Sequence, residues 1–257
     1  MMNLHKFGMR VLALAFVLLL LGARVVHAAD VRVAVAANFT APMQMIAQAF
    51  EQETGHKVHL AFGSTGGFYA QIKNGAPFQV FMAADEATPT LLVQEGWGVA
   101  NSRAPYAMGK LVLWSAQAGL VDDKGDVLKS ARYQRLALAN PKLAPYGAAA
   151  LETLRALGLV SQTQSKWVQG ENVAQTYQFV ASQNAQLGFV SLSQVLKDGK
   201  IAQGSAWVVP AHFYSPIRQD MLLLTSAQND AAARALLQFM RSDKAQTIIR
   251  SFGYGLP

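Results

Sequence analysis

Residues 31–40 read VRVAVAANFT and residues 58–67 read VHLAFGSTGG, and both segments follow one arrangement. Each begins with an apolar run typical of a buried strand, continues into an uncharged polar loop, and leads into a helical pattern. The first N–H groups of a helix have no partner inside it, and the helix dipole is positive at that end. Two such loops facing each other would bind a small oxyanion through neutral donors.

The N-terminus has the pattern of a bacterial secretory signal. Two basic residues lie in the first ten, an apolar run fills 11–21, and small residues occupy 26–29. The apolar run is well short of the roughly 20 residues that a bilayer-spanning helix needs, although an uncleaved anchor is the alternative. We predict a signal peptide over residues 1–29, cleaved near Ala28 or Ala29, and an exported protein.

Charge and cysteine content narrow the class of protein. The chain has 22 Lys and Arg against 15 Asp and Glu, and without the predicted leader its formal charge falls from +7 to about +4. The basic residues are scattered, so no nucleic acid partner is expected. The absence of cysteine excludes disulfides and thiolate chemistry. About 230 remaining residues suffice for one large domain or two small ones.

Strands and helices alternate along the rest of the chain, which is typical of open α/β sheets. Apolar runs predict strands at 31–37, 58–62, 79–84, 111–114, 135–139, 167–169, 187–190, 207–210 and 220–225. Helical spacing and capping residues predict helices at 43–55, 68–73, 85–95, 127–130, 148–157, 173–182 and 193–197, with one or two more in 230–252.

We expect these elements to form two lobes, each a mixed and mostly parallel sheet flanked by helices. Residues 30–107 with 219–257 would form the first lobe and 108–218 the second, with crossings near 106–110 and 215–219. Ligands of such folds bind at the carboxyl ends of strands. The expected site is therefore the cleft between the lobes.

Five separated segments carry a more specific signal. They are VAVAANFTAPMQMIAQAFEQETG at 33–55, AFGSTGGFYAQIKNGAPFQVFMAAD at 61–85, NPKLAPYG at 140–147, GENV at 170–173 and FGY at 252–254. In this order they resemble the periplasmic molybdate-binding proteins (ModA family) of the ABC transporters for molybdate and tungstate. The resemblance covers nearly the whole chain after the predicted leader.

The resemblance implies a two-lobed periplasmic binding protein of type II. Such a protein closes on one molybdate or tungstate ion and delivers it to the membrane permease of an ABC importer, as a monomer without a cofactor. Sulfate or phosphate, which are also tetrahedral oxyanions, are the alternative ligands.

The resemblance also implies which residues bind the ion. By matched position the donors are Asn38 and Ser64 in the first lobe, with Tyr146 and the backbone N–H of Val173 in the second. Asn38 stands where many members have serine, so an amide would donate in place of a hydroxyl. Ser191 stands where some members have tyrosine, which leaves its contribution open. Further candidates are Ala37, Phe39, Thr65 and Asn172.

Uncharged donors suit discrimination among dianions. Arg or Lys would attract any dianion strongly, whereas fixed dipoles in a closed, dry site select by cavity size and protonation. Such donors repel the hydroxyl of hydrogen phosphate, and sulfate is smaller than molybdate. We therefore expect molybdate and tungstate to bind better than sulfate or phosphate.

Each candidate residue has a purely structural alternative. Asn38 could cap its helix, the glycines of 63–67 could serve only a turn, and Tyr146 could pack its ring across the cleft.

An enzyme with Ser64 as nucleophile is the main rival function. The segment around Ser64 does not read G-x-S-x-G, and no Lys follows its glycines as in a P-loop. His56 and His59, three residues apart at a strand start, would point to opposite faces and share no metal. We therefore expect no enzymatic activity.

Overall fold

The computed structural model describes residues 28–257. The predicted signal peptide, residues 1–29, lies outside the described residues except for its last two positions. Within 28–257 no helix combines the length and the apolar character needed to cross a bilayer.

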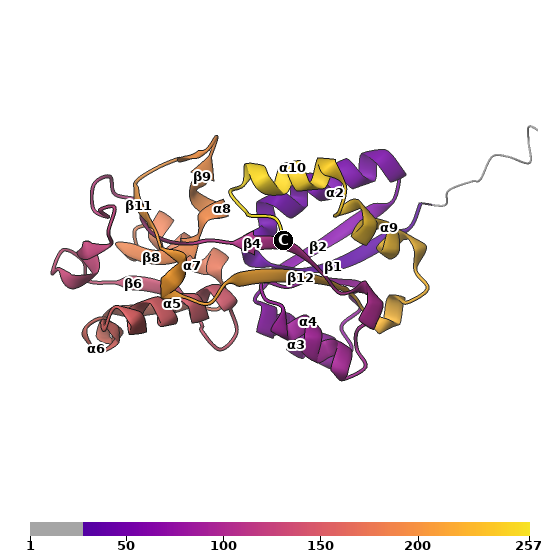
Figure 1. Cartoon of the computed structure of the whole chain (residues 1–257), viewed down its shortest axis with the longest axis horizontal. Coiled ribbons are helices and arrows are strands. Elements are labelled where there is room, and N and C mark those ends of the chain that lie inside the picture. The colour runs from indigo at the N-terminus through magenta and orange to yellow at the C-terminus, as the bar shows by residue number, and fades with distance from the viewer. Residues whose placement is uncertain (1–27) are drawn as a thin grey trace, which may run out of the picture.

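The first of two five-stranded sheets is built from both ends of the chain. Its strands, in spatial order, are β2 (Lys57–Gly63), β1 (Asp30–Ala36), β3 (Val80–Met82), β12 (Ile217–Leu223) and β4 (Ala104–Gly109). β1 pairs in parallel with β2 and β3, whereas β12 runs antiparallel to β3 and β4. One face is covered by α2 (Thr40–Thr54), α9 (Ala231–Phe239) and α10 (Asp243–Ser251), and the other by α3 (Thr65–Lys73) and α4 (Ala87–Gln94) (Figure 1). We call this sheet with its helices the first lobe.

The second sheet comes from the middle of the chain. Its strands, in spatial order, are β11 (Ser205–Val208), β5 (Leu111–Ser115), β8 (Leu187–Ser191), β6 (Leu136–Ala139) and β7 (Trp167–Gly170). β6 is parallel to β7 and β8, whereas β5 is antiparallel to β8 and β11. Its helices are α5 (Pro145–Ala156), α6 (Val160–Thr163), α7 (Val173–Ala181) and α8 (Leu192–Val195). We call this group, with the small hairpin β9 (Leu196–Lys197) and β10 (Lys200–Ile201), the second lobe.

The predicted α/β class with two mixed sheets is confirmed, and parallel pairings make up half of the pairs in each sheet. Short 3-10 helices complete the fold: η1 (Ala37–Phe39), η2 (Ala100–Ser102), η3 (Asp126–Lys129), η4 (Gln164–Lys166), η5 (Ala211–Phe213) and η6 (Thr225–Ala227).

Burial on both faces explains the apolar character of β1. Val33 and Val35 pack with Ile46 in the cluster under α2, whereas Ala34 and Phe81 belong to the cluster on the opposite face. A central strand covered by helices on both sides has no polar face, so it reads as a continuous apolar run.

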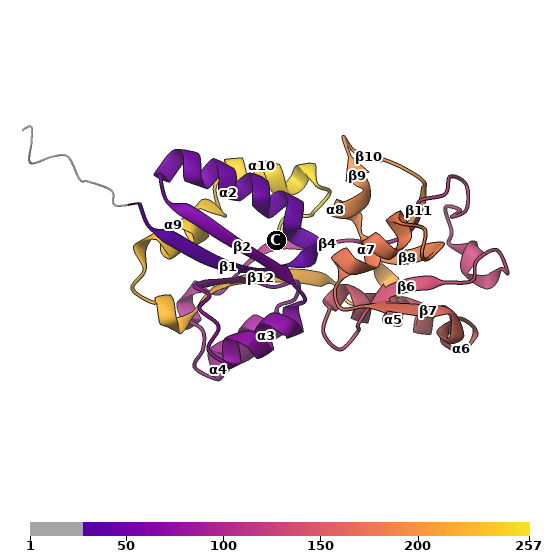
Figure 2. The same cartoon turned by 180° about the vertical axis from the view of Figure 1, so that it is seen from behind.

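The two lobes lie side by side along the long axis of the molecule, and two stretches of chain join them (Figures 1 and 2). The outward connection passes from β4 to β5 through Lys110, and the return leads from β11 into β12. Residues 106–110, predicted to be a connection, belong mostly to the strand β4. Pro105 cannot donate a hydrogen bond to a neighbouring strand, and it is tolerated because β4 lies at the edge of its sheet.

Helix α5 begins three residues earlier than the predicted start at residue 148. Pro145 occupies its first turn, where the missing N–H has no intrahelical partner to lose. The earlier start matters because it places Tyr146 in the first turn of the helix.

Candidate functional site

A small cavity lies between the lobes, which we call the interlobe cavity. Its lining residues follow the carboxyl ends of parallel strands in both sheets. They are Ala36, Ala37, Asn38, Gly63, Ser64, Thr65, Ala84, Ala144, Pro145, Tyr146 and Val173.

Three α-helices and one 3-10 turn begin at this lining. α3 starts at Thr65, α5 at Pro145 and α7 at Val173, while η1 starts at Ala37. The first N–H groups of each α-helix are unpaired within the helix, and its dipole is positive there. The cavity therefore has a positive potential without a cationic side chain.

No charged residue is among the eleven that line the interlobe cavity. The space inside it is small, about 10 Å³, which is close to the minimum that one water molecule needs.

Ser64 and Thr65 present donors from the start of α3. The Ser64 Oγ accepts the Gly67 N–H at 3.3 Å and so caps the helix. Within the described chain, neither the Ser64 hydroxyl proton nor the Thr65 N–H has an acceptor. The Thr65 Oγ1 accepts the Ala84 N–H at 3.0 Å, which ties this loop to the end of β3.

Val173 presents its backbone N–H from the start of α7. The Asn172 side chain caps this helix by accepting the N–H groups of Ala174 and Gln175, both at 3.0 Å. The cap leaves the Val173 N–H without an acceptor among residues 28–257. Asn172 itself does not line the cavity, because its side chain is engaged in the cap.

Tyr146 enters the cavity from the second lobe and is 2% exposed. Its hydroxyl oxygen accepts the Ser191 Oγ–H at 3.0 Å and the Gln219 Nε2–H at 3.4 Å. In the described part of the chain nothing accepts the Tyr146 proton. Burial raises the pKa of Tyr146 well above its ordinary value, so the phenol stays protonated at neutral pH.

Asn38 lines the cavity, but its side-chain donors are engaged elsewhere. The Nδ2 group donates to the Gln219 Oε1 at 2.8 Å and to the Tyr254 Oη at 2.9 Å. These bonds leave no amide hydrogen of Asn38 for a solute in this arrangement. The structural alternative is wrong, because the Asn38 side chain caps neither η1 nor α2. The role of Asn38 as a ligand donor stays a prediction.

The remaining candidates divide by position. Ala37 lines the cavity, whereas Phe39 is buried in the first lobe with its ring 4.8 Å from that of Tyr106 and 5.4 Å from that of Tyr254. Ser191 lies behind the lining, where its Oγ is 3.0 Å from the Tyr146 hydroxyl and 2.9 Å from the Ser193 Oγ.

Sequence reasoning missed a group of buried polar side chains behind the cavity: Tyr106, Ser193, Gln219 and Tyr254. The Asn38 carbonyl accepts the hydroxyls of Ser193 at 2.9 Å and Tyr254 at 2.7 Å, so this group joins both lobes. Two signals could have pointed to it. Tyr254 lies in the FGY segment, and Gln219 lies in the polar stretch Arg218–Asp220, which interrupts the apolar residues of β12.

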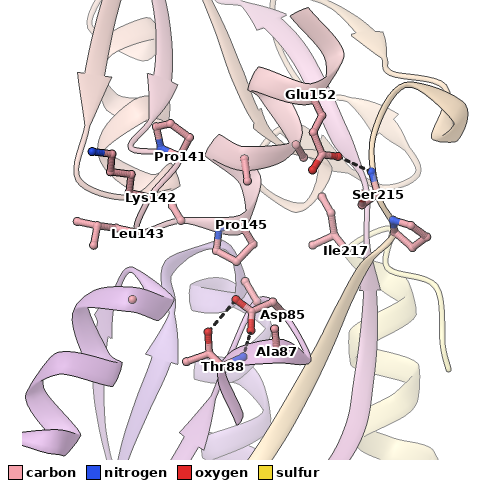
Figure 3. A pocket seen from close by; sticks show the side chains of 16 residues that line it. Asp85, Ala87, Thr88, Pro141, Lys142, Leu143, Pro145, Glu152, Ser215 and Ile217 are labelled. Atoms are coloured by element: carbon pink, nitrogen blue, oxygen red, sulfur yellow. Dashed lines mark hydrogen bonds between the residues drawn. The ribbon is translucent and has the colours of Figure 1, made fainter. Parts of the chain in front are cut away.

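A larger cavity of about 260 Å³ opens beside the interlobe cavity and shares part of its lining. We call it the outer cavity. Its lining includes Asp85, Lys142 and Glu152. Figure 3 shows that each carboxylate is held by local donors: Asp85 accepts the N–H and hydroxyl of Thr88, and Glu152 accepts the Ser215 N–H at 2.6 Å.

No cluster of three or more His, Cys, Asp or Glu side chains that could hold a metal ion occurs within residues 28–257.

Comparison with known proteins places the chain in a family. The model of the bacterial extracellular solute-binding proteins matches residues 31–255. The molybdate-binding protein ModA of Azotobacter vinelandii is 58% identical over 230 residues, which cover 90% of this chain and 91% of that protein. ModA of Rhodobacter capsulatus is 49% identical over 228 residues, or 88% of each chain.

A solved structure agrees with these relatives. The periplasmic molybdate-binding protein of Azotobacter vinelandii superposes with a TM-score of 0.86 at 42% identity, covering 88% of this chain and 99% of that one. The chain therefore belongs to the bacterial extracellular solute-binding proteins and, within them, to the family of the molybdate-binding proteins named ModA.

Proposed function

We propose that this protein is an extracytoplasmic receptor that binds molybdate, and also tungstate, in the interlobe cavity. One observation carries the proposal: an uncharged cavity between two lobes, at which three α-helices begin. The choice of molybdate follows from the names of the relatives. The geometry explains why such an ion would be stable in this cavity.

The donors would come from both lobes. The first lobe offers the Ser64 hydroxyl and the Thr65 N–H, and the second offers the Tyr146 hydroxyl and the Val173 N–H. Hydrogen bonds to an ionised acceptor are shorter and about twice as strong as neutral ones. An ion that bonds to both lobes would favour their closed arrangement over an open one.

The cavity would select a ligand by size and protonation. A fully deprotonated tetrahedral ion can accept a hydrogen bond at each oxygen, whereas hydrogen phosphate has a hydroxyl that would face another donor. Molybdenum would enter only as the bound oxyanion, which is cargo and is not ligated by protein side chains. The loaded receptor would then deliver it to the permease of an ABC importer, in the periplasm and as a monomer.

The test is thermal and calorimetric. The protein without residues 1–29 is titrated with molybdate, tungstate, sulfate and phosphate, and its unfolding is followed at matched ligand concentrations. A ligand at about a hundred times its dissociation constant should raise the free energy of unfolding by about 2.7 kcal/mol. We expect that increase with molybdate and tungstate only. Equal stabilisation by sulfate would contradict the proposed selectivity, and no effect of any oxyanion would contradict the proposed function.

A further inference from the structure

We propose that Gln219 is a positioning residue for ligand binding: its amide group orients the Tyr146 hydroxyl so that the phenol proton is donated into the interlobe cavity. The inference rests on the proposed function, since it concerns how the same cavity holds its oxyanion. Gln219 does not line that cavity and would act through Tyr146.

Gln219 occupies an irregular position in the first sheet. Its side chain is 0% exposed, and the register between β12 and β4 shifts between Gln219 and Asp220. Such an irregularity turns a side chain away from the regular alternation of a strand. Here the side chain reaches the junction of the lobes.

Two partners fix which way the amide points. The Gln219 Oε1 accepts the Asn38 Nδ2–H at 2.8 Å, and it shares the Tyr106 Oη–H, at 3.0 Å, with the Ala83 carbonyl at 2.8 Å. Both partners of the Gln219 oxygen belong to the first lobe. An amide oxygen has two lone pairs, so these two bonds satisfy it. The Nε2 group must then point the other way, where it donates to the Tyr146 oxygen at 3.4 Å.

This direction decides what the Tyr146 hydroxyl can do. Its oxygen already accepts hydrogen bonds from Gln219 and from Ser191. A phenol whose oxygen accepts two bonds can still donate one proton, and the interlobe cavity is the space that this side chain lines. Both groups pack against the backbone of Gly109, where an added Cβ would overlap the Tyr146 hydroxyl and the Gln219 amide.

The surroundings make the neutrality of residue 219 important. Its titratable neighbours are Tyr106, Tyr146 and Tyr254, and burial raises the pKa of all three, so they stay neutral near pH 7. Both residues adjacent to Gln219 in the chain are in ion pairs: the Arg103 Nη1 lies 2.5 Å from the Asp220 Oδ2, and the Arg218 Nε lies 3.2 Å from the Glu86 Oε2. A carboxylate at position 219 could only accept. It would accept hydrogen bonds from both Asn38 and Tyr146, so the Tyr146 proton would point away from the interlobe cavity. It would also add a negative charge behind the bound anion.

The first experiment is therefore Gln219→Glu, measured as the molybdate dissociation constant at pH 6, 7 and 8. At pH 8 we expect affinity about 100-fold below wild type, since a charge-assisted hydrogen bond to the ligand is lost and charge repulsion is added. Burial raises the pKa of the introduced carboxyl group, so lowering the pH should protonate it. The protonated group can donate to Tyr146 as the amide does, and affinity should recover toward pH 6.

The wild-type protein at the same three pH values corrects for protonation of the ligand itself. Gln238→Glu adds the same charge on the exposed face of α9 and should bind as wild type does. A Gln219→Glu variant that binds as tightly as wild type at pH 8, or whose loss is the same at all three pH values, would overturn the proposal.

The second experiment asks whether Gln219 acts through Tyr146. Gln219→Met keeps the approximate volume but removes the hydrogen bonds, and Tyr146→Phe removes the donor. If Gln219 acts through Tyr146, the loss of affinity caused by Gln219→Met should be at least about tenfold in wild type and small in the Tyr146→Phe background. Equal losses in both backgrounds would indicate a purely structural role and overturn the inference.

Folding is checked separately by thermal unfolding of each variant without ligand. If Gln219→Met fails to fold, the pH profile of Gln219→Glu decides alone. The two proposals fail on different results. If the wild-type protein binds no molybdate, the proposed function is contradicted. If the wild-type protein binds molybdate and the Gln219 variants bind it equally well, only this inference is contradicted.

Discussion

The two neighbouring cavities between the lobes differ sharply in charge. The interlobe cavity has no charged lining residue, whereas the outer cavity has Asp85, Lys142 and Glu152. The boundary falls between adjacent residues, because Ala84 belongs to both linings and Asp85 to the outer one alone. Charge is therefore tolerated next to the proposed anion site but does not enter it.

The hydrogen bonds of the outer cavity show how this separation is kept. Asp85 is held by the Thr88 N–H at 2.8 Å and Glu152 by the Ser215 N–H at 2.6 Å. Each carboxylate therefore has a local donor. At the helix starts of the interlobe cavity, the N–H groups of Thr65 and Val173 have no acceptor within residues 28–257, so these two donors are free for a solute.

The largest effect on binding should come from Ser64→Asp, which puts a charge into the uncharged interlobe cavity. Aspartate is a good helix cap, so α3 should still form. Its carboxylate would face a dianion at a few ångströms, and two unit charges 4 Å apart repel by about 4 kcal/mol at an effective dielectric constant of about 20. We expect at least a thousandfold loss of molybdate affinity by calorimetry.

The matched control for that variant is Ser64→Asn, which has the same shape and caps equally well but carries no charge. Its affinity should fall by far less than that of Ser64→Asp. Similar losses in both variants would mean that shape, and not charge, decides binding at this position.

The next largest effect should come from Tyr146→Phe, which removes one donor and leaves the ring packing intact. Loss of a hydrogen bond to a charged ligand costs about 1.5 to 3 kcal/mol. We expect a corresponding loss of molybdate affinity. Tyr69→Phe serves as the control, because the Tyr69 hydroxyl bonds to the Glu95 carboxylate at the surface. Unchanged affinity in Tyr146→Phe would show that its proton does not reach the ligand.

The sequence predicted those parts of the fold and the site that depend on local pattern. Continuous apolar runs marked the buried strands, and the loops after β1 and β2 lie at the interlobe cavity as the strand–loop–helix pattern indicated. Ser64, Tyr146 and Val173 line the same cavity although they are far apart in the chain. Their roles as ligand donors stay a prediction.

Features that depend on tertiary contacts could not be predicted from the sequence. The side chain of Asn38 is set by partners 181 and 216 residues away, Gln219 and Tyr254, and no local pattern encodes those contacts. The edge strand β4 contains Pro105 and Gly109, which read as a connection because only pairing with β12 makes them a strand.

A smaller effect is expected at the contact between the lobes beside the two cavities. The Gly66 N–H donates to the Leu143 carbonyl at 2.8 Å across the lobes, and a Cβ on Gly66 would lie 3.1 Å from the Leu143 Cα. Gly66→Ala should therefore hinder closure by a few tenths of an ångström and weaken affinity by about 1 kcal/mol or less. Alanine favours helix α3, so the ligand-free protein should unfold no more easily. A loss of ligand-free stability equal to the loss of binding would place the effect inside the first lobe.

The smallest effect on binding should follow from Asp85→Asn, which removes a charge from the outer cavity. An asparagine oxygen can still accept the Thr88 N–H, so this hydrogen bond at the start of α4 should persist. The half-buried Asp85 charge lies outside the interlobe cavity, where solvent and salt screen it in part, so molybdate affinity should change by about threefold at most.

The same variant should nevertheless change how stability depends on pH. Burial raises the pKa of Asp85, so the folded protein binds more protons than the unfolded chain at pH values just above the ordinary aspartate pKa. The free energy of unfolding must therefore decrease as the pH rises from about 4 through the raised pKa, and Asp85→Asn should remove that part of the decrease. Urea titrations at pH 4, 5, 6 and 7 measure it as a difference between wild type and variant. That difference includes the interaction of Asp85 with Asp220, because the Asp220 charge also raises the pKa of Asp85. The opposite result would be a variant whose stability depends on pH as in wild type but whose molybdate affinity is reduced. The charge of Asp85 would then affect ligand binding and not the stability of the fold.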